Sequence, residues 1–147
     1  MPTIITEYLN GRKPADFVKL MKDQQVDSVI DVRFSAKYPE YFTYPNIHAL
    51  MRKEGNYKTV TYQPLGNPSW NRPPKQTDWN IAKKTYLEYI QTKQAYYLRN
   101  LVNWVSGELV KNKTFCLICY CPTTDPRLCH RFWLQEFLIT KISGAEK

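Results

Sequence analysis

Short apolar runs alternate with longer amphipathic segments along this chain, and this alternation limits the possible folds more than any other feature. Four runs rich in β-branched and apolar residues have the character of strands: residues 3–9, 26–32, 57–63 and 115–121. Helical patterns separate them. Because a helical crossover returns the chain in the same direction, such strands pair in parallel. The sequence predicts an α/β fold: a single three-layer domain over residues 1–147, with a mostly parallel sheet of about four strands and helices on both faces.

Start and stop signals place the helices between these strands. Pro14 suits the first turn of a helix, and Asn46 is expected to cap a helix over residues 47–53 that Gly55 ends. Another helix begins at position 77 or 78 and runs to Ile90, and the last opens near His130. A fifth is indicated by apolar residues at helical spacing: Leu98, Leu101, Val102, Val105 and Leu109.

The N-terminus and the cysteines indicate the compartment. No basic start followed by an apolar run opens the chain, and no stretch has the roughly 18 apolar residues of a membrane span. All four cysteines lie within residues 116–129, which is not the dispersed pattern of a disulfide framework. We therefore expect a cytoplasmic protein with reduced thiols and no membrane partner.

The charge balance favours a phosphate-rich partner. Lys and Arg number 21 against 13 acidic residues, for a formal charge of +8, and aromatic residues make up 14% of the chain. Cations neutralise phosphates while aromatic rings stack on bases. The alternative is that the lysines are solvated and the rings fill the core.

Polar residues follow two of the predicted strands at their carboxyl ends, where open parallel sheets bind ligands. Asp31 and Arg33 follow one strand, and the other leads through a loop to a helix that starts near Arg131. If Arg33 and Arg131 converge beside that helix N-terminus, they form an anion site. The alternative is a salt bridge from Asp31 to one of the two arginines that only ties loops together.

Two long loops, residues 33–45 and 63–80, are expected to rise over the same edge. They interleave cations with aromatic rings, a composition that suits nucleotide binding. Their candidate ligand-binding residues are Tyr38, Trp70 and Arg72. The alternative is that these rings cover the open edge of a small sheet.

Several of these segments together resemble one protein family. The matching residues are Ile30-Asp31-Val32-Arg33, Leu65-Gly66, and Cys121, Asp125-Pro126 and Cys129-His130-Arg131. In order and spacing they are similar to the signature of domain of unknown function family four-eight-eight (DUF488), over residues 3–138. The resemblance implies the α/β fold and a site, but no activity. The chain has Pro122-Thr123 where that family has Ala-Glu, so a role that depends on the Glu is not carried over.

The cysteine segment has three chemical interpretations. Four side chains are possible zinc donors: Cys119, Cys121, Cys129 and His130. Their spacing is poor for zinc, so no metal or cofactor is expected. Thiol catalysis is the second interpretation, with Cys121, Cys129 and His130 as candidate catalytic residues; Cys129 begins a helix, which lowers a thiol pKa. In the third, the cysteines pack while His130 and Arg131 present donors to a ligand.

The leading hypothesis is a protein that binds nucleic acid or a phosphorylated nucleotide at a basic, aromatic-rich edge. Its ligand-binding residues are Asp31, Arg33, Arg131 and the three loop residues above. The alternative is an enzyme that acts on a phosphate-containing or thiol-reactive substrate through Cys129 or Cys121. Neither the reaction nor an oligomeric state follows from the sequence.

Overall fold

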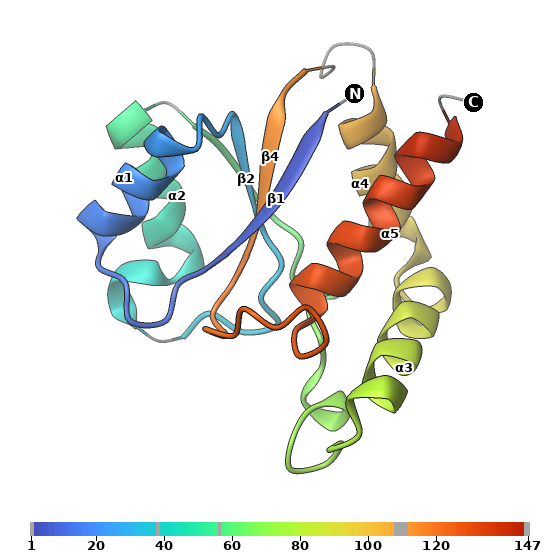
Figure 1. Cartoon of the computed structure of the whole chain (residues 1–147). Helices are drawn as coiled ribbons and strands as arrows, with labels where there is room; N and C mark the ends of the chain where they lie inside the picture. The colour runs from blue at the N-terminus through green and yellow to red at the C-terminus, as the bar shows by residue number, and fades with distance from the viewer. Residues whose placement is uncertain (1, 38, 56, 108–111, 146–147) are drawn as a thin grey trace.

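Four parallel strands form one sheet at the centre of the molecule (Figure 1). The structure, a computed structural model, describes residues 2–37, 39–55, 57–107 and 112–145. The strands are β1 (Thr3–Tyr8), β2 (Ser28–Asp31), β3 (Lys58–Thr61) and β4 (Thr114–Cys119). Their order is β1-β4-β2-β3, and every neighbouring pair is parallel. The predicted α/β class and the four-stranded parallel sheet are confirmed.

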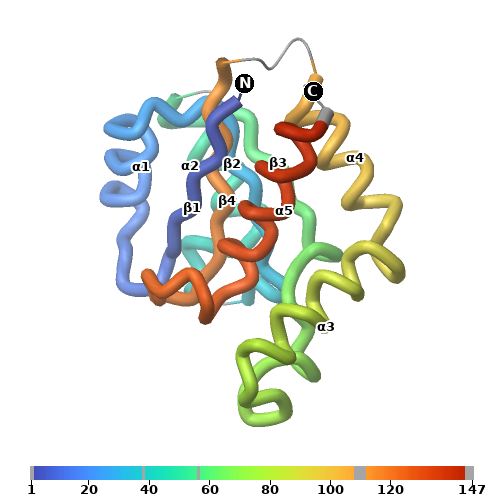
Figure 2. Tube along the Cα trace, turned by 45° about the vertical axis from the view of Figure 1, so that its right-hand side comes forward, coloured from blue at the N-terminus to red at the C-terminus, as the bar shows by residue number. Residues whose placement is uncertain are grey.

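Helices cover both faces of the sheet (Figure 2). On one face lie α1 (Pro14–Asp23) and α2 (Tyr44–Gly55). On the other lie α3 (Trp79–Thr92), α4 (Ala95–Ser106) and α5 (His130–Ala145). Short 3-10 turns occupy the long loops: Glu40–Phe42, Gln63–Leu65 and Ser69–Asn71. Within the described residues, no helix combines the length and apolar character needed to cross a bilayer.

Alternation along β4 divides the core in two. Cys116 and Ile118 pack with α1 and α2, whereas Phe115 and Leu117 pack with the three helices of the opposite face. Successive side chains of a strand point to opposite faces, so both layers are built on this one strand. Cys119 is the last residue of β4 and shares the face of Leu117.

Some ends of helices and strands agree with the sequence prediction, and others differ from it. The helix expected to begin at position 77 or 78 begins at Trp79, and Asp78 caps it by accepting hydrogen bonds from the amides of the second and third helical residues. The predicted cap at Asn46 is wrong, because α2 already begins at Tyr44 and Pro45 suits its first turn. The strand predicted over residues 115–121 ends at Cys119, where its pairing with β1 ends. Leu109, assigned to the α4 stripe, lies outside the described residues.

The chain leaves neighbouring strands β2 and β4 in opposite directions. After β2 it passes to α2 on one face, and after β4 it passes to α5 on the other. The two connections diverge at the carboxyl ends of these strands and leave a crevice there, the usual ligand position in open α/β sheets. In Figure 1 this end of the sheet is at the bottom, beside the loop that precedes α5.

Candidate functional site

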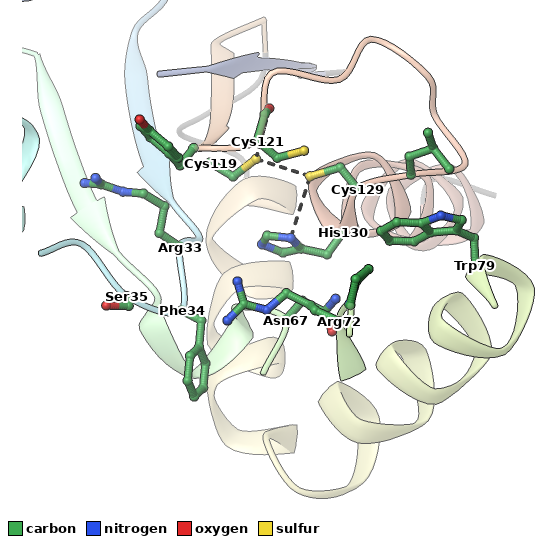
Figure 3. A pocket seen from close by; sticks show the side chains of 13 residues that line it. Arg33, Phe34, Ser35, Asn67, Arg72, Trp79, Cys119, Cys121, Cys129 and His130 are labelled. Carbon is green, nitrogen blue, oxygen red and sulfur yellow. Dashed lines mark hydrogen bonds between the residues drawn. The ribbon is translucent and has the colours of Figure 1, made fainter. Parts of the chain in front are cut away.

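A pocket of about 350 Å³ lies at the carboxyl ends of β2 and β4 (Figure 3). Its walls come from the loop after β2, from the loop between β3 and α3 with the first residue of α3, and from the stretch that runs from the end of β4 to the start of α5. The lining residues are Arg33, Phe34, Ser35, Asn67, Arg72, Pro73, Trp79, Cys119, Tyr120, Cys121, Leu128, Cys129 and His130. The pocket therefore joins three segments that lie far apart in the sequence.

Arg33 lines this pocket, but its guanidinium is engaged by Asp31. Its Nε donates to both carboxylate oxygens of Asp31, at 2.8 and 3.1 Å, and Nη2 donates to Oδ2. Both side chains are buried. Figure 3 shows the guanidinium turned away from the cysteines. Of the salt bridges considered from sequence, the structure shows the Asp31–Arg33 pair.

Arg131 lies beneath the pocket and ties the loop after β4 to α5. Its Nη1 donates to the sulfur of Cys119 at 3.2 Å and to the carbonyl of Cys121 at 2.9 Å, while Nη2 donates to the carbonyl of Thr123. Arg131 is buried and does not line the pocket. Like Arg33, it directs its guanidinium at groups of the protein itself rather than at open pocket space.

Three thiols meet at the floor of the pocket. The sulfurs of Cys119 and Cys129 are 3.2 Å apart, and Cys121 lines the pocket beside them. Cys119 and Cys129 are buried and Cys121 is exposed, and all three are free cysteines. The sulfur of Cys119 therefore contacts both the Cys129 thiol and the guanidinium of Arg131.

This arrangement lowers the pKa of Cys119, not that of Cys129. The hydrogen bond from Cys129 lowers the Cys119 pKa most, and Arg131 acts in the same direction, against the effect of burial. The expected fall in the Cys129 pKa is wrong. Its hydrogen bond to Cys119 raises the pKa of Cys129 to about 11. The pKa of Cys121 is also raised, chiefly by its hydrogen bond to Cys129.

His130 is the first residue of α5 and is oriented by β2. Its Nε2 lies 2.7 Å from the carbonyl of Val32, which can only accept, so Nε2 carries the proton. The other ring nitrogen, Nδ1, lies 3.7 Å from the sulfur of Cys129. Burial lowers the His130 pKa to about 4, against the effect of the Val32 carbonyl. At neutral pH, Nδ1 therefore has a free lone pair beside a thiol.

The match to a family model covers most of the chain: residues 13–138 match the domain of unknown function DUF488. The chain belongs to the DUF488 family. No curated protein and no solved structure matches it.

The geometry explains why the DUF488 motifs of this chain occur together. The Asp-Val-Arg motif supplies the Asp31–Arg33 pair and the carbonyl that orients His130. In the Leu-Gly motif, a Cβ on Gly66 would stand 2.5 Å from the backbone of Phe34, so glycine allows the two loops to touch. Thr123, at a departure from the family pattern, contacts Arg131 through its backbone carbonyl.

Two loop residues proposed from the sequence differ in position from the rest. Arg72 lines the pocket, and its guanidinium lies 5.9 Å from the ring centre of Phe34. Trp70 does not line the pocket; it is 49% exposed and packs edge-on against Tyr89. Tyr38 lies outside the described residues.

The sequence placed Trp79 in the aromatic loop and Cys119 at the carboxyl end of the fourth strand, but neither was selected as a ligand-binding or catalytic residue. The end of the apolar run at a sheet edge was the signal that could have identified Cys119. Among the residues that the structure describes, no group of three or more His, Cys, Asp or Glu side chains is arranged to hold a metal ion.

Proposed function

We propose that this DUF488 protein binds a phosphorylated nucleotide in the pocket between β2 and β4. The observation that carries the proposal is the pairing of an arginine with a helix N-terminus at one pocket. Arg72 lines it, and α5 begins at His130 on its floor. The free amides and partial positive charge of a helix N-terminus attract phosphate, and a guanidinium adds a second favourable contact.

Aromatic rings give the same pocket a surface for a base. Phe34 and Trp79 line it from opposite sides in Figure 3. Both rings are half-buried, so each keeps an accessible surface. A volume of about 350 Å³ is at the small end of the range for ligand pockets, which suits one nucleotide.

The support favours a single nucleotide over a long nucleic acid. Asp31 engages Arg33, and Cys119 together with two backbone carbonyls engages Arg131, so these arginines do not form an exposed basic track. Trp70 does not line the pocket. The arginine, the helix N-terminus and the aromatic rings that support binding all lie at this one pocket, whereas a polynucleotide needs a groove that follows its backbone.

Titration of AMP, followed by the fluorescence of the tryptophans or by calorimetry, tests the proposal. We expect saturable binding that weakens with salt, and a loss of about tenfold or more in affinity for Arg72→Gln. Lys141→Gln is the matched control, because Lys141 is an exposed cation on α5 that lines a different pocket. Absence of binding at low salt, or equal losses in the two variants, would reject the proposal.

A thiol-dependent enzyme is the second candidate. The observation in its favour is that Cys119, a thiol with a lowered pKa, lines the pocket. The attacking group would then be Cys119 rather than Cys121 or Cys129, whose pKa values are raised. Mass mapping after brief treatment with iodoacetamide below neutral pH tests this candidate. Labelling of Cys119 ahead of Cys121 supports it, and the reverse order opposes it.

A further inference from the structure

Two thiols are in contact at the floor of the pocket, where the sulfurs of Cys119 and Cys129 are 3.2 Å apart. We propose that Cys119 and Cys129 form a redox-active dithiol that hydroperoxides, reaching Cys119 through the pocket, convert to an intramolecular disulfide. This activity goes beyond nucleotide binding and does not depend on it.

Cys119 has the environment of an attacking thiol. It stands at the carboxyl end of β4, where the sheet ends and the pocket begins. The Nη1 atom of Arg131 lies 3.2 Å from its sulfur and stabilises a thiolate there by charge and by hydrogen bonding. The pKa of Cys119 is accordingly lowered. The residue is 2% exposed, so access is through the pocket and favours a small oxidant.

Cys129 has the environment of a resolving thiol. It retains its proton at neutral pH, since its pKa is raised to about 11, and it donates to Cys119. The unprotonated Nδ1 of His130 lies 3.7 Å from its sulfur and contacts the thiol without taking its proton, since the His130 pKa is lowered to about 4. The bond from Nε2 of His130 to the carbonyl of Val32 fixes the ring in this orientation. Cys119 is thus suited to attack the peroxide, and Cys129 to form the disulfide afterwards.

The reaction proceeds in two balanced steps. The Cys119 thiolate attacks one oxygen of hydrogen peroxide; the O–O bond breaks, Cys119 becomes a sulfenic acid, and hydroxide leaves to solvent. Cys129 then attacks the sulfur of Cys119 while its thiol proton passes to the sulfenic oxygen. The S–O bond breaks, and the oxygen takes up that proton and leaves as water. Two thiols have lost two electrons to the peroxide, and a small dithiol such as dithiothreitol reverses the change.

The other two cysteines provide contrasts within the chain. Cys116 packs on the opposite face of the sheet, and burial raises its pKa. Cys121 is exposed and lines the same pocket as Cys129, so it is the competing partner for a disulfide. Its pKa is raised, which makes it the weaker nucleophile at neutral pH despite its exposure.

The test treats the reduced protein with about one equivalent of hydrogen peroxide, without nucleotide, and then blocks free thiols with N-ethylmaleimide. Peptide mapping of the wild-type chain without reduction identifies the bond formed. We expect a Cys119–Cys129 linkage that dithiothreitol removes. A linkage through Cys121, or no linkage while all thiols remain free, would overturn the proposal.

Variants then assign the two roles. Cys129→Ser is expected to leave a sulfenic acid at Cys119, which dimedone traps, and Cys119→Ser is expected to slow thiol loss about tenfold or more. Cys116→Ala, which removes the thiol on the opposite face of the sheet, is the matched control and should oxidise as the wild type does. Dimedone labelling at another cysteine, or unchanged thiol loss in Cys119→Ser, would contradict the assignment. AMP binding is measured separately, so failure of one proposal does not decide the other.

Discussion

Both carboxylate oxygens of Asp31 accept hydrogen bonds from the guanidinium of Arg33, two residues further along the chain. The Nε atom of Arg33 lies 2.8 Å from Oδ1 and 3.1 Å from Oδ2, and the two side chains are only 0% and 2% exposed. The backbone amide of Arg33 also donates to Oδ1, at 3.1 Å. The pair joins two residues at the end of β2. Because Asp31 engages the guanidinium, Arg33 forms part of the pocket wall and does not offer this group to a ligand.

Breaking that pair should be costly. Asp31→Ala leaves a buried guanidinium without its counterion, and we expect the free energy of unfolding to fall by about 3–5 kcal/mol. Urea denaturation followed by tryptophan fluorescence measures the loss. The double variant Asp31→Leu with Arg33→Met removes both charges and should lose much less. A loss below about 1 kcal/mol in the single variant would show that the pair does not stabilise the fold.

Removing Arg131 should raise the pKa of Cys119. Its guanidinium is a hydrogen-bond donor and a positive charge beside this sulfur, and both lower the thiol pKa. In Arg131→Met, the thiolate absorbance in the near ultraviolet should therefore develop at higher pH than in the wild type. Arg127→Met is the control, because Arg127 is exposed and pairs with Asp125. Identical titration curves for wild type and Arg131→Met would contradict the assignment.

His130 should make the protein less stable in weak acid. Its pKa in the folded protein is lowered to about 4, whereas the unfolded chain keeps the ordinary value of 6.5. Above pH 6.5 the His130 side chain is neutral in both the folded and the unfolded state. Between about pH 6.5 and 4 it is protonated in the unfolded state but not in the folded state, so the free energy of unfolding falls as the pH falls. The total contribution is at most about 3 kcal/mol.

The variant His130→Gln removes the titrating group but can still donate to the carbonyl of Val32. Stability measured by urea denaturation across this pH range should depend less on pH in the variant than in the wild type. The His130 ring protons should titrate by NMR with a midpoint near 4. A midpoint at or above the ordinary 6.5 would refute the prediction.

Adding one methyl group at Gly66 should disturb the pocket. Its Cβ would stand 2.5 Å from backbone atoms of Phe34, so the two loops would have to separate. Gly66→Ala is expected to destabilise the fold by about 1–3 kcal/mol. Gly144→Ala is the matched control, since nothing lies within 4 Å of its Cβ position in helix α5. Thermal unfolding of the two variants makes the comparison, and equal melting temperatures would contradict it.

The fold was predictable because its signals are local. Apolar runs fix the strands, Asp78 has the side chain of a helix cap, and α5 opens at His130 where the sequence placed it. The rule for strand ends also pointed to the edge of the sheet where the structure has a pocket, because parallel strands all end on the same side.

The roles of individual side chains were not predictable in the same way. Whether Asp31 pairs with Arg33 or with Arg131 depends on where β2 and α5 come to lie. Cys129 was expected to have the lower pKa because it begins a helix, a local argument. In the structure that effect is outweighed by its hydrogen bond to Cys119, a contact between segments that only the fold brings together.

The central position of β4 also sets the order in which the molecule can be completed during synthesis. Thr3 of β1 pairs with Thr114, so the first strand has no neighbour in the sheet until the last strand has left the ribosome. β2 and β3 can pair earlier, since they are adjacent in both sequence and sheet. In the nascent chain, the edges of β1 therefore stay unpaired until β4 takes its place in the sheet. During this interval, aggregation or binding by chaperones competes with folding.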